Sequence, residues 1–160
     1  MIVIGLFKRS SLLERSNAKM HEKHTVRDWM ADLVVFVDPD QTVYEILSIM
    51  RRRYINSVMV RKSEGNQDFG IVTSRDISDK IVAENRNPKE VLVRDVMSSP
   101  VVAAAQNLSV KECAILMRER HIHHLPVKDD SGLIIGMVSA SDFLLIAEAM
   151  GTNFQERSLS

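Results

Sequence analysis

The chain has 160 residues, of which 45% are hydrophobic and 26% are charged, as is typical of a soluble globular protein of one compact domain or two small ones. Lysine plus arginine equal aspartate plus glutamate at 21 each, so the composition gives no overall attraction to nucleic acids or anionic membranes. The single cysteine, Cys113, excludes an intrachain disulfide and a cysteine-rich zinc site and fits a reducing cytoplasm.

Residues 1–25 form an N-terminal extension that precedes the first regular pattern. Its apolar start, MIVIGLF, is far shorter than the roughly 20 residues that a membrane-spanning helix needs. It also lacks the flanking residues of a signal peptide, so we expect neither a membrane span nor a cleaved leader. We predict that the extension is partly helical around Leu12, Leu13 and Met20 and that it strengthens a dimer or docks a partner.

The segment that follows alternates strands and helices. VVFV at 34–37 predicts a strand, and apolar residues at helical spacing from Val43 to Met50 predict a helix. Thr42 and Glu45 form the capping box that starts this helix. Strands are predicted at 56–61 and 69–72, followed by a helix from Thr73 to about Ala83.

The polar stretch 84–92 is predicted to be a linker in which Pro88 starts a short helix. Beyond it, we predict a strand at 100–105, a helix capped by Ser109 and Glu112, and strands at 123–128 and 133–138. A last helix runs from Ser139 to about Met150, and 149–160 is a tail. Cys113 lies on the apolar face of its helix, which indicates core packing rather than catalysis.

These elements form an internal repeat. VRDWM at 26–30 recurs as VRDVM at 93–97, and GIVTSRD at 70–76 recurs as GMVSASD at 136–142. Each copy has the order strand, helix, strand, strand, helix. A unit of about 60 residues buries little surface by itself. We therefore predict an α+β fold of two pseudo-twofold-related β-α-β-β-α repeats, 26–83 and 93–148, packed through their sheets.

Each repeat contains a motif in which a hydroxyl residue is followed three positions later by aspartate: Thr73 with Asp76, and Ser139 with Asp142. This motif has two interpretations. The pattern is a helix-start signature in which the hydroxyl satisfies a backbone N–H. A helix start also offers N–H groups to phosphate, and a carboxylate accepts hydrogen bonds from ribose hydroxyls. The residues alone leave both interpretations open.

Three kinds of segment occur in the same order in both repeats, and with them the chain resembles a tandem pair of cystathionine β-synthase (CBS) domains, also called a Bateman module. VRDWM and VRDVM look like the opening V-x-D-x-M segment of this family. HIHHLPV at 121–127 and the two segments that end at Asp76 and Asp142 look like two further family segments. The resemblance spans roughly 26–147. It implies that adenosine-containing ligands, namely AMP, ADP, ATP or S-adenosylmethionine, bind in clefts between the two repeats.

The resemblance also implies which residues contact the ligand. The hydroxyl and the aspartate of the family motif contact phosphate and ribose, which selects Thr73, Asp76, Ser139 and Asp142. In kinase-regulatory members a basic pair before LPV reaches the phosphates, which selects His123 and His124, although a histidine stands where arginine is common. The rest of the candidate ligand-binding set is Arg75, Val58 and Pro126.

Several of these residues also have a simpler interpretation. Arg75 could be a solvated helix residue, and Ser141 replaces it in the second repeat. The first repeat has Asn56 and Ser57 in place of the two histidines and Met59 in place of the proline, which weakens the case for phosphate binding there. The histidines could be surface residues. We predict no metal site, because no local cysteine or acidic cluster completes one.

The sequence contains no recognisable set of catalytic residues, so we expect a stand-alone regulatory module rather than an enzyme. We expect this module to signal by a conformational change. Its ligand would be an adenosine nucleotide, with no other cofactor, and we expect a cytoplasmic homodimer with an unidentified regulated partner. The basic run MRRRY at 50–54 complements a helix dipole and does not indicate nucleic-acid binding. The alternatives are a structural dimerisation module with vestigial sites and an enzyme acting on nucleotide phosphates.

Overall fold

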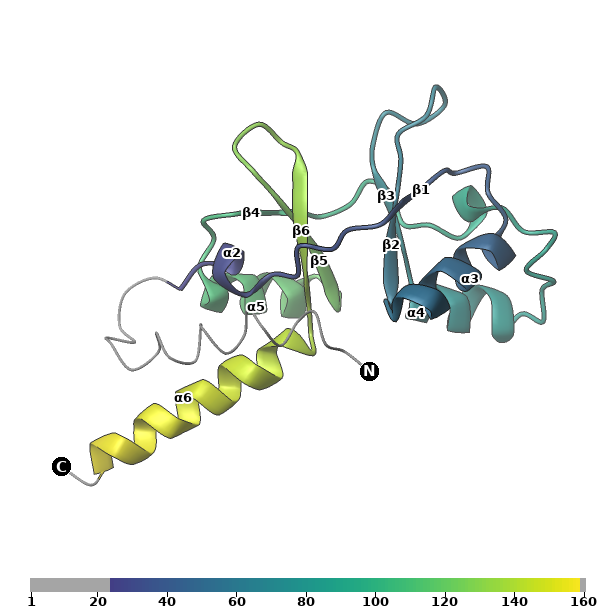
Figure 1. The fold of residues 1–160 in the computed structure, drawn as a ribbon. Coiled ribbons are helices and arrows are strands. Elements are labelled where there is room, and N and C mark those ends of the chain that lie inside the picture. Colours follow the sequence, from purple (N-terminus) through teal and green to yellow (C-terminus); the bar gives the residue numbers. More distant parts are fainter. Residues whose placement is uncertain (1–23, 159–160) are drawn as a thin grey trace. The chain divides into compact units, whose positions relative to one another are not determined.

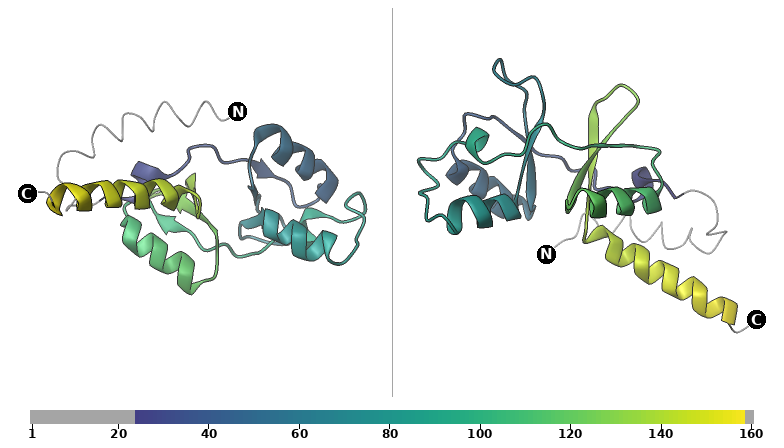
Figure 2. Two further views of the ribbon diagram at one scale, coloured as in Figure 1. Left: turned by 90° about the horizontal axis from the view of Figure 1, so that it is seen from below. Right: turned by 180° about the vertical axis from the view of Figure 1, so that it is seen from behind.

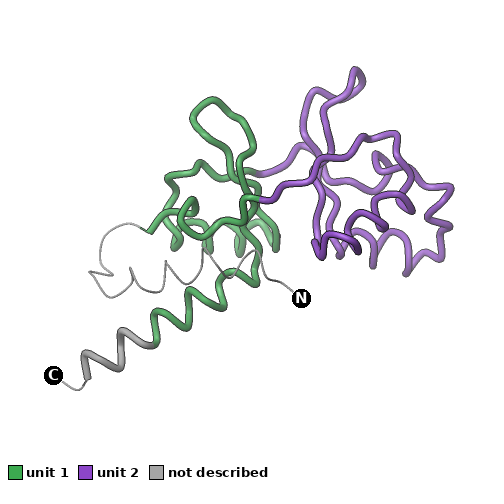
Figure 3. Tube along the Cα trace, viewed as in Figure 1, with its two compact units in different colours: residues 1–32, 103–160 green, residues 33–102 purple. Residues whose placement is uncertain are grey.

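A computed structural model describes the backbone of residues 24–158 and the side chains of residues 24–151. The predicted helix around Leu12, Leu13 and Met20 lies outside the described residues. The chain divides into two compact units. Unit 1 comprises 1–32 and 103–160, and unit 2 comprises 33–102, as the two colours of Figure 3 show.

The same order of elements occurs in both units (Figures 1 and 2). Unit 2 contains β1 (Phe36–Val37), α3 (Val43–Arg53), β2 (Ser57–Val60), β3 (Gly70–Thr73), α4 (Ser74–Ile77), the π-helix η1 (Ser78–Val82) and the 3-10 helix η2 (Val93–Asp95). Unit 1 contains α2 (Val26–Trp29), β4 (Ala104–Ala105), α5 (Val110–Glu119), β5 (His124–Lys128), β6 (Ile134–Ser139) and α6 (Asp142–Ser158). The predicted repeat of strand, helix, strand, strand, helix is therefore confirmed.

Each unit has one three-stranded sheet with its strands in sequence order. The first two strands pair in parallel across the helix, and the last two form an antiparallel hairpin. In unit 2, α3 and η1 bury Ile46, Met50 and Ile81 against Val58 and Val72 of the sheet. Both predicted capping boxes are present, because the Thr42 hydroxyl accepts from Glu45 N and the Ser109 hydroxyl accepts from Glu112 N.

The opening segments are exchanged between the sequence repeats. The segment of the first repeat belongs to unit 1, where Ala31 and Met137 exchange two backbone hydrogen bonds of 2.9 and 3.0 Å. The segment of the second repeat belongs to unit 2, where Ser98 and Ile71 exchange bonds of 2.9 and 3.0 Å. Each sheet is therefore completed by a segment that comes from the other repeat of the sequence.

A methionine and a glycine in these segments fit one another. A Cβ on Gly70 would lie 2.5 Å from Sδ of Met97, and a Cβ on Gly136 would lie 2.8 Å from Cγ of Met30. Both distances are well below van der Waals contact. A methyl group at either glycine would displace the methionine of the exchanged segment, which packs over it.

Some boundaries differ from the prediction. The helix after Thr73 continues as the π-helix η1, and α6 runs to Ser158 through most of the predicted tail. The prediction of a short helix at Pro88 is wrong: 88–90 is a turn. The reason is that the Pro88 and Val91 carbonyls accept from the first amides of α3, those of Tyr44 and Val43, at 3.0 and 2.9 Å.

Candidate ligand-binding site

Thr73 ends β3 and is the N-cap of α4, so the capping interpretation of this residue is confirmed. Its backbone N–H donates to Oδ2 of Asp76 at 2.8 Å, and its hydroxyl donates to the same oxygen at 3.0 Å. The amide of Asp76 donates back to the hydroxyl at 3.4 Å. Because the hydroxyl hydrogen is directed at Asp76, a phosphate would receive it only after the hydroxyl turns.

The second oxygen of Asp76 is also engaged. Nζ of Lys80 lies 2.7 Å from Oδ1 of Asp76 and donates to the Val96 carbonyl at 2.6 Å. The Asp76 side chain is only 12% exposed. A carboxylate has about four acceptor positions, so three bonds leave about one for a ligand hydroxyl. Lys80 was missed by the sequence analysis, although its spacing of four residues from Asp76 is a helical ion-pair signal.

Two further predicted residues of unit 2 differ in exposure. Arg75 is exposed and pairs with Asp79 at 3.5 Å, with side chains 67% and 58% exposed. Val58 is buried in β2 opposite Val72. The structure thus places Arg75 at the surface of the motif helix, where its guanidinium is held only by an exposed pair, and Val58 in the core.

The start of β2 lies directly beside the motif. Ser57 pairs with Thr73, and the Asn56 carbonyl accepts from Ser74 N at 2.9 Å. Asn56 and Ser57 are the positions that match the histidines of the second repeat. The hairpin therefore brings together the two segments that the sequence analysis selected separately.

Unit 1 repeats this arrangement with other side chains. The Ser139 amide and hydroxyl donate to Oδ2 of Asp142 at 2.8 and 3.0 Å, and Asp142 is buried. The hydroxyls of Ser139 and Ser141 lie 2.8 Å apart. His124 pairs with Ser139, and the His123 carbonyl accepts from Ala140 N at 2.9 Å. His123 is exposed and His124 is half-buried, so two imidazoles border this end of the sheet.

Pro126 has a structural role in the same hairpin. It pairs with Met137, whose backbone groups bond to Ala31 on the other side of β6. The missing N–H of Pro126 therefore faces away from β6, towards β4. In unit 2 the matching residue Met59 does donate, to the Val35 carbonyl at 2.9 Å. The Pro126 side chain is buried in unit 1.

Other chemistry is limited in the described part of the chain. Cys113 is fully buried, as predicted, and burial raises the pKa of its thiol to about 11, so it stays protonated at neutral pH. Among the described residues, no three His, Cys, Asp or Glu side chains gather in a way that could hold a metal ion. Within the same residues, no helix has the length and apolarity needed to cross a bilayer.

Comparison with known proteins identifies relatives of the whole repeat region. An uncharacterised protein of Methanopyrus kandleri is 36% identical over 123 residues, which are 77% of this chain but only 62% of that protein. The CBS domain-containing protein YhcV of Bacillus subtilis is 31% identical over 74% of this chain and 81% of its own length. The chain covers only 27% of the inosine-5′-monophosphate dehydrogenase of Methanocaldococcus jannaschii, at 28% identity.

Solved structures show the same fold. A hexameric CBS-CP12 protein from bloom-forming cyanobacteria has a TM-score of 0.72, with 27% identity over 76% of this chain and 67% of that one. A CBS domain pair in complex with 5′-methylthioadenosine and S-adenosyl-L-methionine has a TM-score of 0.67, with 25% identity over 82% of this chain and 99% of that one. The CBS domain profile matches residues 26–83 and 93–148. The chain therefore belongs to the CBS domain family and carries a CBS pair, which is a regulatory module.

Proposed function

We propose that the protein is a sensor that binds adenosine-containing ligands at the hairpin ends of its two units. The observation that carries this proposal is the convergence, in each unit, of a hydroxyl, a carboxylate and the polar start of the neighbouring strand. Carboxylates accept from ribose hydroxyls, and imidazoles and exposed amides donate to phosphate. The related CBS pair that binds 5′-methylthioadenosine and S-adenosyl-L-methionine supports this class of ligand.

The signal would be a shift between conformations. A ligand that binds one conformation more tightly raises the population of that conformation, and a partner protein reads the change. We propose that the module acts without catalysing a reaction and works as a homodimer in the cytoplasm. The hexameric state of a related CBS protein supports self-association.

A structural module with vestigial sites is the second candidate. The observation that favours it is the engagement of Asp76, whose two oxygens are already bonded to Thr73 and Lys80. If the protein is such a structural module, it self-associates, and no adenosine-containing ligand raises its thermal stability.

Ligand-dependent thermal unfolding separates the two candidates. Titrations with AMP, ADP, ATP and S-adenosylmethionine should each be followed by differential scanning fluorimetry. A ligand present at 100 times its Kd should add about 2.7 kcal/mol to the free energy of unfolding. A flat response to all four, in a protein that is a dimer by light scattering, would favour the structural module.

Matched variants then test the residues. Asp76→Asn and Asp142→Asn each weaken the hydrogen bonds that the carboxylate accepts from the residue three positions earlier, and Glu45→Gln weakens the same type of interaction at the start of α3. All three substitutions should lower the midpoint of thermal unfolding of the ligand-free protein. Only the aspartate variants should also lose the ligand-induced rise. An equal rise in all three variants would contradict the assignment of the site.

A further inference from the structure

Lys80 joins two acceptors of unit 2 that come from different repeats of the sequence. Its Nζ lies 2.7 Å from Oδ1 of Asp76 and donates to the Val96 carbonyl at 2.6 Å. Asp76 belongs to α4, in the first repeat, whereas Val96 directly follows η2, in the opening segment of the second repeat. The ammonium therefore closes a contact that exists only because this opening segment belongs to unit 2.

Lys80 is bonded to the part of Asp76 that a ligand would use. The backbone and hydroxyl donors of Thr73 both bond to Oδ2 of Asp76, so the oxygen without a Thr73 bond is Oδ1. Lys80 donates to this Oδ1. A carboxylate oxygen has about two acceptor positions. Ribose hydroxyls that bind Asp76 must therefore share Oδ1 with the ammonium or displace the ammonium from it.

The ammonium is accessible and able to move. The Lys80 side chain is 37% exposed, whereas that of Asp76 is 12% exposed. An ammonium has three donors, and the contacts with Asp76 and the Val96 carbonyl use two of them. The flexible four-carbon stem of a lysine allows the charged group to turn without movement of the backbone. The ammonium can thus transfer from Asp76 to a group of a bound ligand.

The cost of this transfer depends on the charge of the ligand. Neutral ribose hydroxyls that displace the ammonium leave a partly buried cation without a counter-charge, which is unfavourable. A ligand that also carries a phosphate supplies a new counter-charge from the same ribose, so the cation exchanges one anion for another. A nucleoside without an anionic group supplies the hydroxyls alone.

We propose that Lys80 restricts unit 2 to nucleosides that carry an anionic group, such as a 5′-phosphate. The proposal rests on the proposed function and names the class of ligand that unit 2 accepts. The ribose takes Oδ1 of Asp76, and the released ammonium binds the phosphate. Ile146 stands at the matching position of the second repeat, so unit 1 has no lysine there and this selection belongs to unit 2.

Isothermal titration calorimetry with AMP and with adenosine tests the proposal. Lys80→Met keeps an unbranched stem and removes the charge, and it should weaken AMP binding about 5- to 30-fold, as expected for a partly exposed charged contact. The same variant should bind adenosine about 2- to 10-fold more tightly, because Oδ1 of Asp76 is no longer occupied. A loss of stability by itself would weaken both probes. An unchanged ratio of the AMP and adenosine affinities would overturn the proposal.

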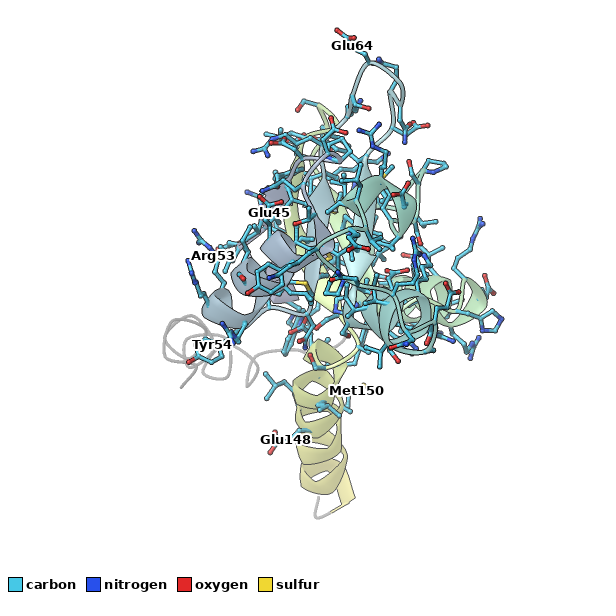
Figure 4. The ribbon with its side chains drawn as sticks, turned by 90° about the vertical axis from the view of Figure 1, so that its right-hand side faces the viewer. Glu45, Arg53, Tyr54, Glu64, Glu148 and Met150 are labelled. Atoms are coloured by element: carbon cyan, nitrogen blue, oxygen red, sulfur yellow. The ribbon has the colours of Figure 1, made fainter. Side chains whose placement is uncertain are left out.

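Lys62→Met is the matched control, because it removes a positive charge from the same unit but away from the motif. Lys62 lies in the loop between β2 and β3, with its Nζ 4.9 Å from the centre of the Phe69 ring. Figure 4 shows Glu64 of this loop at the opposite end of unit 2 from Tyr54, which precedes the strand that pairs with Thr73. Lys62→Met should leave both affinities unchanged. A loss of AMP binding equal to that of Lys80→Met would overturn the specific role of Lys80.

The native chain provides a second readout, which does not depend on the folding of Lys80→Met. In a protein labelled with ¹³C at lysine Cε, the NMR signal that disappears in Lys80→Arg identifies Lys80. Saturation with AMP should shift this signal. An unchanged signal at AMP concentrations where calorimetry shows binding would overturn the role of Lys80 and leave the sensor function standing. Absence of calorimetric binding by AMP, adenosine, ATP and S-adenosylmethionine would overturn both.

Discussion

Asp76 and Asp142 occupy the same place in their repeats but have different neighbours. Both accept from the hydroxyl residue three positions earlier, and only Asp76 is followed by a lysine four positions later. In the Asp76–Lys80 ion pair, the carboxylate is largely shielded from solvent, and the ammonium also donates to the Val96 carbonyl. The Lys80 contact therefore stabilises unit 2 at the same time as it occupies the candidate site.

Substitution of Lys80 by methionine tests this contact. Lys80→Met should lower the free energy of unfolding by about 1–2 kcal/mol, because it leaves the Asp76 carboxylate without a counter-charge. This figure already allows for solvent screening, since the ammonium is partly exposed. Urea denaturation measures the change. Arg75→Met, which breaks an exposed pair, is the control and should cost less than about 0.5 kcal/mol. Equal losses in the two variants would show that the Lys80 contact is only a surface pair.

At the scale of elements, the exchanged segments depend on two glycines. Gly136→Ala should lower the free energy of unfolding by about 1–3 kcal/mol, because the new methyl group meets Cγ of Met30 and the Ala31 carbonyl, 3.0 Å away. That carbonyl is held by its bond from Met137 N and cannot move aside. Thermal unfolding measures the loss. Gly65→Ala, with no atom within 4 Å of the new Cβ, should be close to neutral; a similar loss there would contradict the packing argument.

The capping boxes of α3 and α5 predict a dependence of stability on pH. Hydrogen bonds from the backbone and hydroxyl of Thr42 lower the pKa of Glu45, and those from the hydroxyl and backbone of Ser109 lower the pKa of Glu112. A carboxyl whose pKa is lower in the folded state stabilises the fold above its unfolded value and loses this contribution as the pH falls through the folded value.

The variant Glu45→Gln/Glu112→Gln tests this linkage. It should be less stable than the native protein at pH 7, and the difference should shrink as the pH falls below about 4.5, where the native carboxylates become protonated. Urea titrations between pH 3 and pH 7 measure it. A difference that is constant over this range would mean that the charge of the two carboxylates has no part in capping.

At the scale of the whole molecule, the units of the fold are not the repeats of the sequence. Unit 2 is the continuous segment 33–102, which includes Val93 and Val96 of the second opening segment, both fully buried in its core. A fragment cut at the repeat boundaries loses these residues. Burial of a valine side chain contributes about 1.5–3 kcal/mol, so the loss is comparable with the stability of a small domain.

Two fragments of similar length test this organisation. Fragment 33–102 should show a cooperative thermal transition by circular dichroism, and fragment 26–92 should not, since it lacks both valines and the pairing of Ser98 with Ile71. Addition of a peptide of residues 93–102 should restore the transition in 26–92. Equal cooperativity of the two fragments without the peptide would contradict the role of the exchanged segment.

The helices, the hairpin strands and the capping boxes followed from the sequence because they depend on local spacing. Apolar residues three and four apart specify α3 and α5, and a hydroxyl three residues before a carboxylate specifies a helix start wherever the rest of the chain lies. The two copies of each motif made the family recognisable for the same reason. The predicted packing of the repeats through their sheets and the remaining site assignments stay predictions.

Tertiary structure alone decided which contacts close each unit. The distance along the chain between Met30 and Gly136, or between Ala31 and Met137, gives no local signal that they meet, because these residues are more than 100 positions apart. The spacing of Asp76 and Lys80 is a local ion-pair signal, but only the fold shows that the Val96 carbonyl, which comes from the second repeat, also holds the ammonium. The sequence by itself determined the elements and the family, and the long-range pairing of those elements determined what surrounds each carboxylate.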